Sequence, residues 1–402
     1  MGYGGGSGSG GSGGSGSSGG AGGSGGGGGG YRTVGGGSAF GGSDDFELPS
    51  YNQAPAGSIR FNTDSKKLEV YILGPVGFGT VPNGIWMEVD SWSPELQTGG
   101  TRALFGGGHT HPGRSDIIDY INVDSTGNAI DFGNLIITKF QAHACASRVR
   151  AYFAGGEGPA TTKNIDTVTI ASTGDATDYG DLVNNVRSNP GFSNSTRGLS
   201  IAGENPGSVN IIEYFALTST GEGIDFGDTI KDRTGPFAVS NSTRGVYGGG
   251  RDSSPATLHG DIEFITLSTL GNGADFGDLD QSVSDFNSGN ISNSVRGLAC
   301  GGYNYPGSPL TYYDYIQYIT IPTLGNATDF GNLTDGRQAG GCASSPTRGV
   351  CGGGHPGGGA PNNTDIIDYV QLMTTGNAVD FGNLTDGRRA IGGCSNGHGG
   401  LG

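Results

Sequence analysis

Apolar and polar residues alternate along short segments of this chain, and the alternation recurs over most of its length. Examples are "IIDYINV" at residues 117–123 and "DIEFITL" at residues 261–267. A side-chain period of two over roughly four to eight residues predicts a β-strand with one buried face. Clusters of Gly, Asn, Ser and Thr between these segments predict turns. No apolar stretch approaches the about 20 residues of a membrane-spanning helix, so we expect an all-β protein that is not inserted in a membrane.

The strands belong to an internal repeat marked by the triplet Asp-(Phe/Tyr)-Gly. The triplet returns at intervals of about 50 residues, and its aspartates are Asp131, Asp178, Asp225, Asp275, Asp329 and Asp380. In a protein kinase the same triplet holds magnesium, but a kinase has one copy and also needs a His-Arg-Asp loop. The chain contains no His-Arg-Asp sequence. The triplet is therefore interpreted as part of a structural repeat.

One repeat unit contains four short β segments in a fixed order. A segment of small residues, such as "GGCASS" at 340–345, precedes a "TRG" segment with a glycine cluster, such as "TRGVYGGG" at 243–250. A polar loop, an alternating strand, a "TTGNA"-type turn and a "DFGNL" segment complete the unit. Four strands per about 50 residues predict a propeller blade. The small residues predict the innermost strand, and the Phe or Tyr of the triplet is expected to pack between sheets.

The number of blades depends on how the ring closes. After the sixth unit, residues 388–402 repeat the first two segments of a further unit. We expect these segments to join N-terminal strands around 68–72 and 85–89 in one shared blade, which would lock the ring and remove open edges. This favours a propeller of seven blades, made of six complete repeats and the shared blade. The alternative is six blades with a separate N-terminal hairpin module.

Composition divides the chain into three regions. Residues 1–43 are a Gly/Ser-rich extension with too few apolar residues to fold alone. This extension is either a flexible tether or a segment that becomes ordered within an assembly. Residues 44–92 predict an N-terminal β module of three strands, for docking or for ring closure. Residues 93–402 are the propeller.

A second recurrence is the Arg of the "TRG" segment. It appears once per unit, as Arg102, Arg150, Arg197, Arg244, Arg296 and Arg348. One Arg and one triplet Asp per unit predict a repeated structural bridge between strands or neighbouring blades, because guanidinium and carboxylate groups pair in a fixed bidentate geometry. The alternative is a calcium ion at each Asp, although no set of oxygen ligands of the Asp-x-Asp-x-Asp-Gly type surrounds it.

Charge and motif content argue against several function classes. The formal net charge is −16, whereas nucleic-acid binding requires a basic surface. His-Glu-x-x-His and Cys-x-x-Cys are absent from the sequence, so we expect neither enzyme activity nor a cofactor. The five Cys are expected to be small buried hydrophobes. His109 and His111 have the spacing of one strand face and are the alternative for a metal site, which is otherwise not expected.

The loop between the second and third strands differs from unit to unit. In the fifth unit it contains Tyr303, Tyr305, Tyr312 and Tyr313. Aromatic clusters stack on sugars or on protein partners, and rigid scaffolds commonly carry binding residues on variable loops. These tyrosines are therefore the candidate binding residues, and local packing between blades is the alternative.

Two resemblances cover most of the chain. The repeat period and the glycine pair after the second strand resemble the kelch repeat over residues 93–402, although the Trp usual late in that repeat is missing. The stretch "NSTRGVYGGG…DIEFITLSTLGNGADFGDL" at 241–279 resembles repeats of virion structural proteins of tailed marine phages, cyanophages in particular. The stretch "AGSIRFNTDSKKLEVYI…GIWMEV" at 56–89 resembles a module of phage tail fibres and other virion proteins.

The resemblance implies a non-enzymatic structural protein of a fibre, tail or capsid. Such a protein is located in the extracellular virion, is present in several copies and contacts other virion proteins through its N-terminal region. The alternative is a receptor- or glycan-binding adhesin whose propeller loops contact a glycan or protein of the host surface. A propeller enzyme is the third interpretation.

Overall fold

The computed structural model describes residues 57–62, 67–72, 85–89, 101–219, 221–286, 289–358 and 362–401. The chain divides into two compact units, Met1–Trp92 and Ser93–Gly402. The Gly/Ser-rich extension expected at residues 1–43 lies outside the described residues.

The described part of the first unit is a three-stranded antiparallel sheet. Its strands are β1 (Ile59–Asn62), β2 (Lys67–Ile72) and β3 (Ile85–Val89), in the order β1-β2-β3. Phe61 lies opposite Leu68, as the alternation of apolar residues predicts. On the sheet, Arg60 pairs with Glu69 at 2.6 Å and stacks over Trp86 at 4.3 Å.

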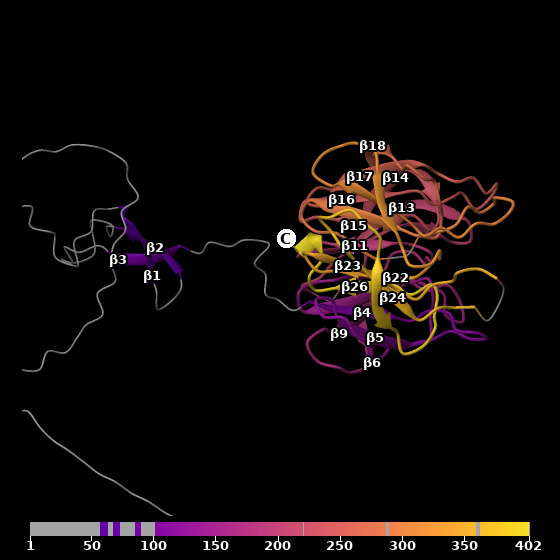
Figure 1. The fold of residues 1–402 in the computed structure, drawn as a ribbon, viewed down its shortest axis with the longest axis horizontal. Coiled ribbons are helices and arrows are strands. Elements are labelled where there is room, and N and C mark those ends of the chain that lie inside the picture. The colour runs from indigo at the N-terminus through magenta and orange to yellow at the C-terminus, as the bar shows by residue number, and fades with distance from the viewer. Residues whose placement is uncertain are drawn as a thin grey trace, which may run out of the picture. The chain divides into compact units, whose positions relative to one another are not determined.

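The second unit is a β-propeller of six antiparallel blades (Figure 1). Blades are named in chain order, and their strands are given from the axis outward. Blade 1 contains β26 (Gly392–Ser395), β4 (Arg102–Gly106), β5 (Ile117–Asn122) and β6 (Ile130–Asn134). Blade 2 contains β7 (His143–Ala146), β8 (Arg150–Ala154), β9 (Asn164–Thr169) and β10 (Thr177–Asp181). Blade 3 contains β11 (Gly191–Ser193), β12 (Arg197–Glu204), β13 (Ser208–Ala216) and β14 (Ile224–Arg233).

The remaining blades repeat the same order. Blade 4 contains β15 (Phe237–Ser240), β16 (Arg244–Gly248), β17 (Asp261–Thr266) and β18 (Ala274–Asp278). Blade 5 contains β19 (Arg296–Cys300), β20 (Tyr315–Thr320) and β21 (Thr328–Asn332), with Ser292 bridging Gly297 at the inner position. Blade 6 contains β22 (Gly341–Ser344), β23 (Arg348–Gly352), β24 (Ile366–Gln371) and β25 (Val379–Asn383).

The ring has six blades, so the prediction of seven blades is wrong. The first repeat begins at its second strand, and β26 supplies the missing inner strand by pairing with β4, with Gly392 opposite Gly106 and Ser395 opposite Ala103. In Figure 1, β26 in yellow lies beside β4 in purple. Strand β26 also contacts the inner strands of both neighbouring blades, β22 and β7. The ring is therefore closed by the C-terminal strand, and the N-terminal strands form a sheet of their own, as the alternative prediction states.

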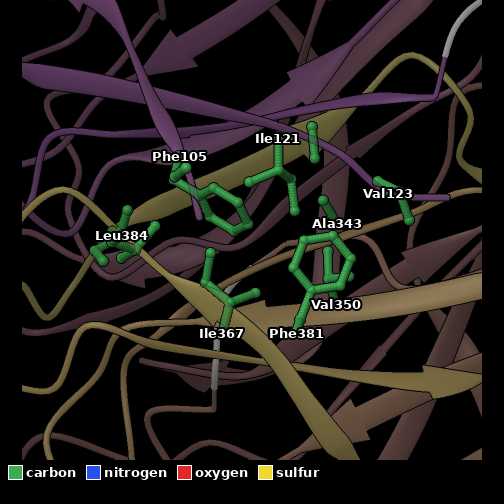
Figure 2. Close-up of a cluster of buried hydrophobic side chains, with 11 residues drawn as sticks. Phe105, Ile121, Val123, Ala343, Val350, Ile367, Phe381 and Leu384 are labelled. Carbon is green, nitrogen blue, oxygen red and sulfur yellow. The ribbon is translucent and has the colours of Figure 1, made fainter. Parts of the chain in front are cut away.

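The hydrophobic core is divided among the junctions between blades. Each of six buried clusters combines residues of two adjacent blades. Figure 2 shows the cluster at the closing junction, where Phe105 and Ile121 of blade 1 face Ile367 and Phe381 of blade 6. Phe381 is buried, which confirms that the aromatic residue of the triplet packs between sheets. Both faces of every blade are thus covered by its neighbours.

Small residues predominate in the innermost strands, as the sequence predicts, although β11 contains Phe192 and β15 contains Phe237 and Val239. Five of the six inner strands place a Ser at one level, and each hydroxyl donates to the carbonyl of the preceding strand: Ser193 to Ala146, Ser240 to Ser193, Ser292 to Ser240, Ser344 to Ser292 and Ser395 to Ser344. Below this ring, buried His398 contacts the Ala146 carbonyl at 3.0 Å and accepts a hydrogen bond from the Asn290 amide at 3.1 Å. The segment that follows β26 is thereby anchored at the axis.

The glycine of each triplet lies where two blades meet. In blade 5, Gly331 has φ +143°, and a Cβ at this position would lie 2.5 Å from the carbonyl oxygen of Gly376 in the turn of blade 6. The same turn donates from the Gly376 amide to the Phe330 carbonyl at 2.8 Å. The "TTGNA" turn of one blade therefore clasps the outer strand of the preceding blade.

All five Cys are buried, as the sequence predicts. They are closer together than equivalent positions in separate blades would suggest, because Cys342 and Cys351 face each other on adjacent strands. Cys300, Cys342 and Cys351 share the core between blades 5 and 6.

Candidate functional site

The Arg residues of the repeat link neighbouring blades, but through a different partner from the one expected. Five of them donate from Nη1 to the backbone carbonyl that follows the third strand of the next blade, at 2.7 to 3.4 Å. The donor–acceptor pairs are Arg102–Ile170, Arg197–Leu267, Arg244–Ile321, Arg296–Leu372 and Arg348–Val123. The same five guanidinium groups stack on an aromatic ring of the third strand in their own blade, 4.2 to 4.9 Å from its centroid.

In blade 2, a different side chain makes the hydrogen bond to the next blade. Arg150 is exposed, and the ring on which it would stack is replaced by Thr167. The Tyr152 hydroxyl instead donates to the Leu217 carbonyl at 2.6 Å. All six junctions therefore have a side-chain hydrogen bond to the same backbone position, and Tyr152 takes the role of the guanidinium in one of them.

The expected bridge between these Arg residues and the triplet Asp residues does not form in the described part of the chain. All six aspartates, Asp131, Asp178, Asp225, Asp275, Asp329 and Asp380, are exposed on the outermost strands. The Arg groups lie on the second strand and reach into the next blade instead. The correction has a physical reason: a strand carbonyl is an acceptor that a sequence pattern does not reveal, and it lies within reach of the guanidinium.

The ion pairs between blades involve a different set of acidic residues from the triplet aspartates. The third strand of each blade has one buried acid or amide at the same position: Asp119, Asp166, Glu213, Glu263, Gln317 and Asp368. Each accepts a hydrogen bond from a backbone amide of the preceding blade, in the second half of its outer strand or just after it, at 2.8 to 3.3 Å. We call this set the buried acid belt.

Four members of the buried acid belt pair with a buried cation from the preceding blade. These pairs are Arg388–Asp119 at 2.6 Å, Lys139–Asp166 at 3.2 Å, Arg337–Asp368 at 2.8 Å and Arg233–Glu263. Burial lowers the pKa of Lys139 and of Arg388, and the paired carboxylates oppose that shift. Breaking such a pair leaves an uncompensated charge in the interior, which typically costs about 3–5 kcal/mol.

The sequence analysis missed this belt, although a signal was present. A lone acid or amide sits in the middle of each apolar third strand, as Asp119 does in "IIDYINV" and Glu263 in "DIEFITL". Alternation alone suggested that these residues point to solvent. They are buried because the blade is covered on both faces.

The candidate tyrosines gather in the loop that joins β19 and β20. Tyr303 stacks on Tyr305 at 5.9 Å and on Tyr312 at 5.8 Å, and Tyr312 meets His355 of blade 6 edge-on at 5.5 Å. Tyr305 is exposed, and Tyr303 and Tyr312 are half-buried. The fourth candidate, Tyr313, packs against the core between blades 4 and 5. Three of the four thus form one stack, here called the tyrosine stack, and the fourth is a packing residue.

Charged groups of blade 4 and its connection border the tyrosine stack. Arg251 lies 5.1 Å from the Tyr305 ring and 3.8 Å from the Asp285 carboxylate. Burial raises the pKa of Asp285, while Arg251 opposes the shift. Burial and the neighbouring Asp285 raise the pKa of Tyr303. The exposed Tyr305 ring thus lies beside a largely buried guanidinium that is paired with a carboxylate, an arrangement that suits a polar ligand on an aromatic platform.

Neither alternative metal site gains geometric support. His109 bridges the backbone of Arg389 and packs edge-on against Phe140 at 5.6 Å, whereas His111 is exposed in the following loop. Among the described residues, no three His, Cys, Asp or Glu side chains are placed to hold a metal ion. The described ranges also contain no helix of the length and apolarity needed to span a bilayer.

No family model matches the chain, and no curated protein matches it in sequence.

Proposed function

We propose that this protein is a non-enzymatic structural component of a virion, displaying its propeller from a fibre, tail or capsid. One observation carries the proposal: most of the residues that repeat from blade to blade serve the junctions between blades. The hydrogen bonds of the repeated Arg residues, the buried acid belt and the close packing at the triplet glycines all link neighbouring blades. The loops between the second and third strands differ from blade to blade. A rigid frame that presents variable loops suits display.

Two further features support this function. The sequence resembles repeats of structural proteins from tailed marine phages, and the acidic net charge of −16 disfavours nucleic acid as a partner. In the N-terminal sheet, the side chains of Ile59, Phe61 and Leu68 are exposed. Apolar groups gathered on one sheet suit docking onto another protein of the particle. The protein is then a multi-copy component of the extracellular particle, attached through its N-terminal region.

Purified particles from an infected culture that carries this gene provide the test. Mass spectrometry is expected to find peptides of residues 101–401 in stoichiometric amounts, and gold-labelled antibodies against the propeller are expected to decorate one defined part of the particle. Particles that lack the protein, while the cell lysate contains it, would overturn the proposal.

The tyrosine stack favours a second function, that of a receptor- or glycan-binding adhesin. Tyr305 offers an exposed ring, and Arg251 and Asp285 lie beside it with polar groups. A glycan array probed with the full chain is expected to give a defined set of ligands, and Tyr305→Ala is expected to weaken binding about tenfold or more, because stacking on a sugar is lost. Ile224→Ala removes an equally exposed side chain from blade 3 and is the matched control. Equal binding by both variants would place the receptor site elsewhere or exclude it.

A further inference from the structure

The junction between blades 2 and 3 departs from the others in one respect. At four junctions, the buried cation lies four positions after the Leu or Thr that stands two residues beyond the triplet Gly: Lys139, Arg233, Arg337 and Arg388. At the junction of blades 4 and 5 this residue is Val283, and the acid is replaced by Gln317, so both charges are absent together. At the junction of blades 2 and 3 it is Val186, yet the acid Glu213 is retained.

Glu213 is buried and has only neutral hydrogen-bond partners among the described residues. Its carboxylate accepts from the Val183 amide at 2.9 Å, from the Asn184 amide at 3.0 Å and from the Asn184 side chain. The nearest guanidinium along the chain, that of Arg187, is paired with Glu157 and Glu204. A buried carboxylate without a cation is a costly arrangement, and its retention requires a reason.

A cavity of about 140 Å³ lies at this junction. Its lining includes the carboxylate-bearing Glu213, the residue Val186 in place of the cation, and the exposed side chains of Asn185 and Asn205. Blade 3 has the small residue Ser200 at a position where blade 4 has Tyr247 and blade 2 has Phe153, and the smaller side chain leaves space here. A single water takes about 30 Å³ in the liquid, so the cavity has room for one small organic cation.

The backbone at the cavity matches the environment of the buried cations elsewhere. Lys139 and Arg337 donate to the carbonyls of Phe153 and Cys351, the positions equivalent to Ser200. Arg388 and Arg233 donate to the carbonyls of Gly107 and Gly249, the positions equivalent to Ala202. Ser200 and Ala202 both line the cavity. The cavity is therefore bordered by the residues equivalent to those whose carbonyls hold the protein's own Arg and Lys side chains.

We propose that this cavity is a binding site for a guanidinium group, which pairs with Glu213 and occupies the place that Arg337 and Arg388 fill at other junctions. Guanidinium is favoured over a simple ammonium because three of the four internal cations are Arg, and because its planar fork can bond a carboxylate and a carbonyl together. Burial and the neighbouring Asp225 raise the pKa of Glu213, which agrees with a carboxylate that lacks its counter-charge. The inference does not depend on the proposed function.

The test is a titration of the full chain with methylguanidinium chloride, followed by NMR of methyl groups. Val209 and Ile211 line the cavity and report on binding, and Val283 at the junction of blades 4 and 5 is the internal reference. A saturable shift at Val209 and Ile211, without one at Val283, is expected. Tetramethylammonium chloride has the same charge but no N–H donor and is expected to give no saturable shift.

Two variants and a control test whether binding depends on the Glu213 carboxylate. Glu213→Gln installs the amide that is native at position 317, and Val186→Arg supplies the cation from the chain itself; both are expected to weaken methylguanidinium binding at least tenfold. Glu222→Gln neutralises an exposed acid and is expected to leave binding unchanged. Wild-type binding that is unsaturable, or that survives in Glu213→Gln or Val186→Arg, would overturn the proposal.

A blocked arginine, N-acetyl-arginine methylamide, distinguishes the source of the group. Binding of both probes indicates that an Arg side chain of a partner can enter, whereas binding of methylguanidinium alone indicates a free small cation. Either result supports the site, and failure of both probes contradicts it.

Discussion

At the scale of single residues, repeated positions of this chain act across blade junctions. Arg296 illustrates the principle, since it stacks on Tyr318 at 4.2 Å within its blade and bonds the Leu372 carbonyl at 2.9 Å in the next. The guanidinium can do both because its face is available to the ring while its edge donates. Arg150 shows the limit of the pattern: the residue is repeated in the sequence, but its stacking ring is absent and Tyr152 makes the bond to the next blade.

Replacing Arg296 by Met is expected to destabilise the propeller, and the same change at Arg150 is not. The first variant loses a charge-assisted hydrogen bond and a cation–π contact, together about 1–3 kcal/mol. Arg150→Met removes an exposed side chain and is expected to change stability by no more than about 0.5 kcal/mol. Urea unfolding, followed by far-UV circular dichroism, measures the free energy of unfolding of both variants. Equal losses would show that the inter-blade bond does not set the contribution of the repeated Arg.

At the scale of elements, outer strands and turns of successive blades form a continuous clasp. The amide of Gly376 donates to the Phe330 carbonyl, and the Asn332 amide donates to the Asn377 side chain at 3.1 Å. The triplet glycine permits this approach because it has no Cβ. The triplet is therefore conserved within the chain by packing, with its Asp left in solvent.

Gly331→Ala and Gly325→Ala form a matched pair for this clasp. Both glycines have similar positive φ, +143° and +154°, so backbone strain is comparable. A Cβ at Gly331 would lie 2.5 Å from a carbonyl of blade 6, whereas a Cβ at Gly325 would meet nothing within 4 Å. Thermal unfolding is expected to show an additional loss of about 1–3 kcal/mol for Gly331→Ala, the usual range for overpacking. Similar melting temperatures for the two variants would argue against a tight clasp.

The C-terminal segment adds a pH dependence at the same scale. Burial lowers the pKa of His398 to about 4, against about 6.5 in an unfolded chain. Between these values the unfolded state binds more protons, so stability is present above about pH 6.5 and is lost as the pH falls toward 4. Unfolding by urea from pH 7.5 to 4.5 is expected to give a shallower decline for His398→Gln than for the wild type. Parallel declines would mean that His398 is not buried in its neutral form.

At the scale of the whole molecule, the ring is held by the pairing of its two ends. Strand β26 supplies the inner strand of blade 1, and the core at the closing junction joins Phe105 with Phe381 (Figure 2). An unpaired β4 would expose a strand edge at the axis, which favours aggregation. Closure is therefore expected to dominate the stability of the propeller.

Two deletions test this closure. Removing residues 392–402 is expected to give a protein that aggregates or unfolds well below the wild-type melting temperature, because blade 1 loses its inner strand. Removing residues 1–92 is expected to leave the melting temperature of the propeller unchanged within about 2 °C, since the described ring closes without them. Size-exclusion chromatography and thermal unfolding report both results. A propeller that also fails without residues 1–92 would reinstate a role for the N-terminal strands in closure.

The sequence by itself determined the local architecture. The period of two, the repeat of about 50 residues and the small-residue segments were sufficient to predict antiparallel blades with an inner position rich in small residues, because these features depend on neighbours along the chain. The aromatic residue of the triplet, exemplified by Phe381, was also placed correctly. The tyrosines were found as a group, because they share one loop.

Only the tertiary structure decided what depends on contacts between distant segments. Whether residues 392–395 begin a seventh blade or complete the first depends on which strand edge is free, and β4 offers it. The acceptor of Arg296 is a backbone carbonyl, which every residue possesses and no sequence pattern marks. That Glu213 lies opposite Val186, without a cation, became visible only in the structure, where the two residues meet across a junction. Its significance depends on burial, because an unpaired charge is costly only in the interior.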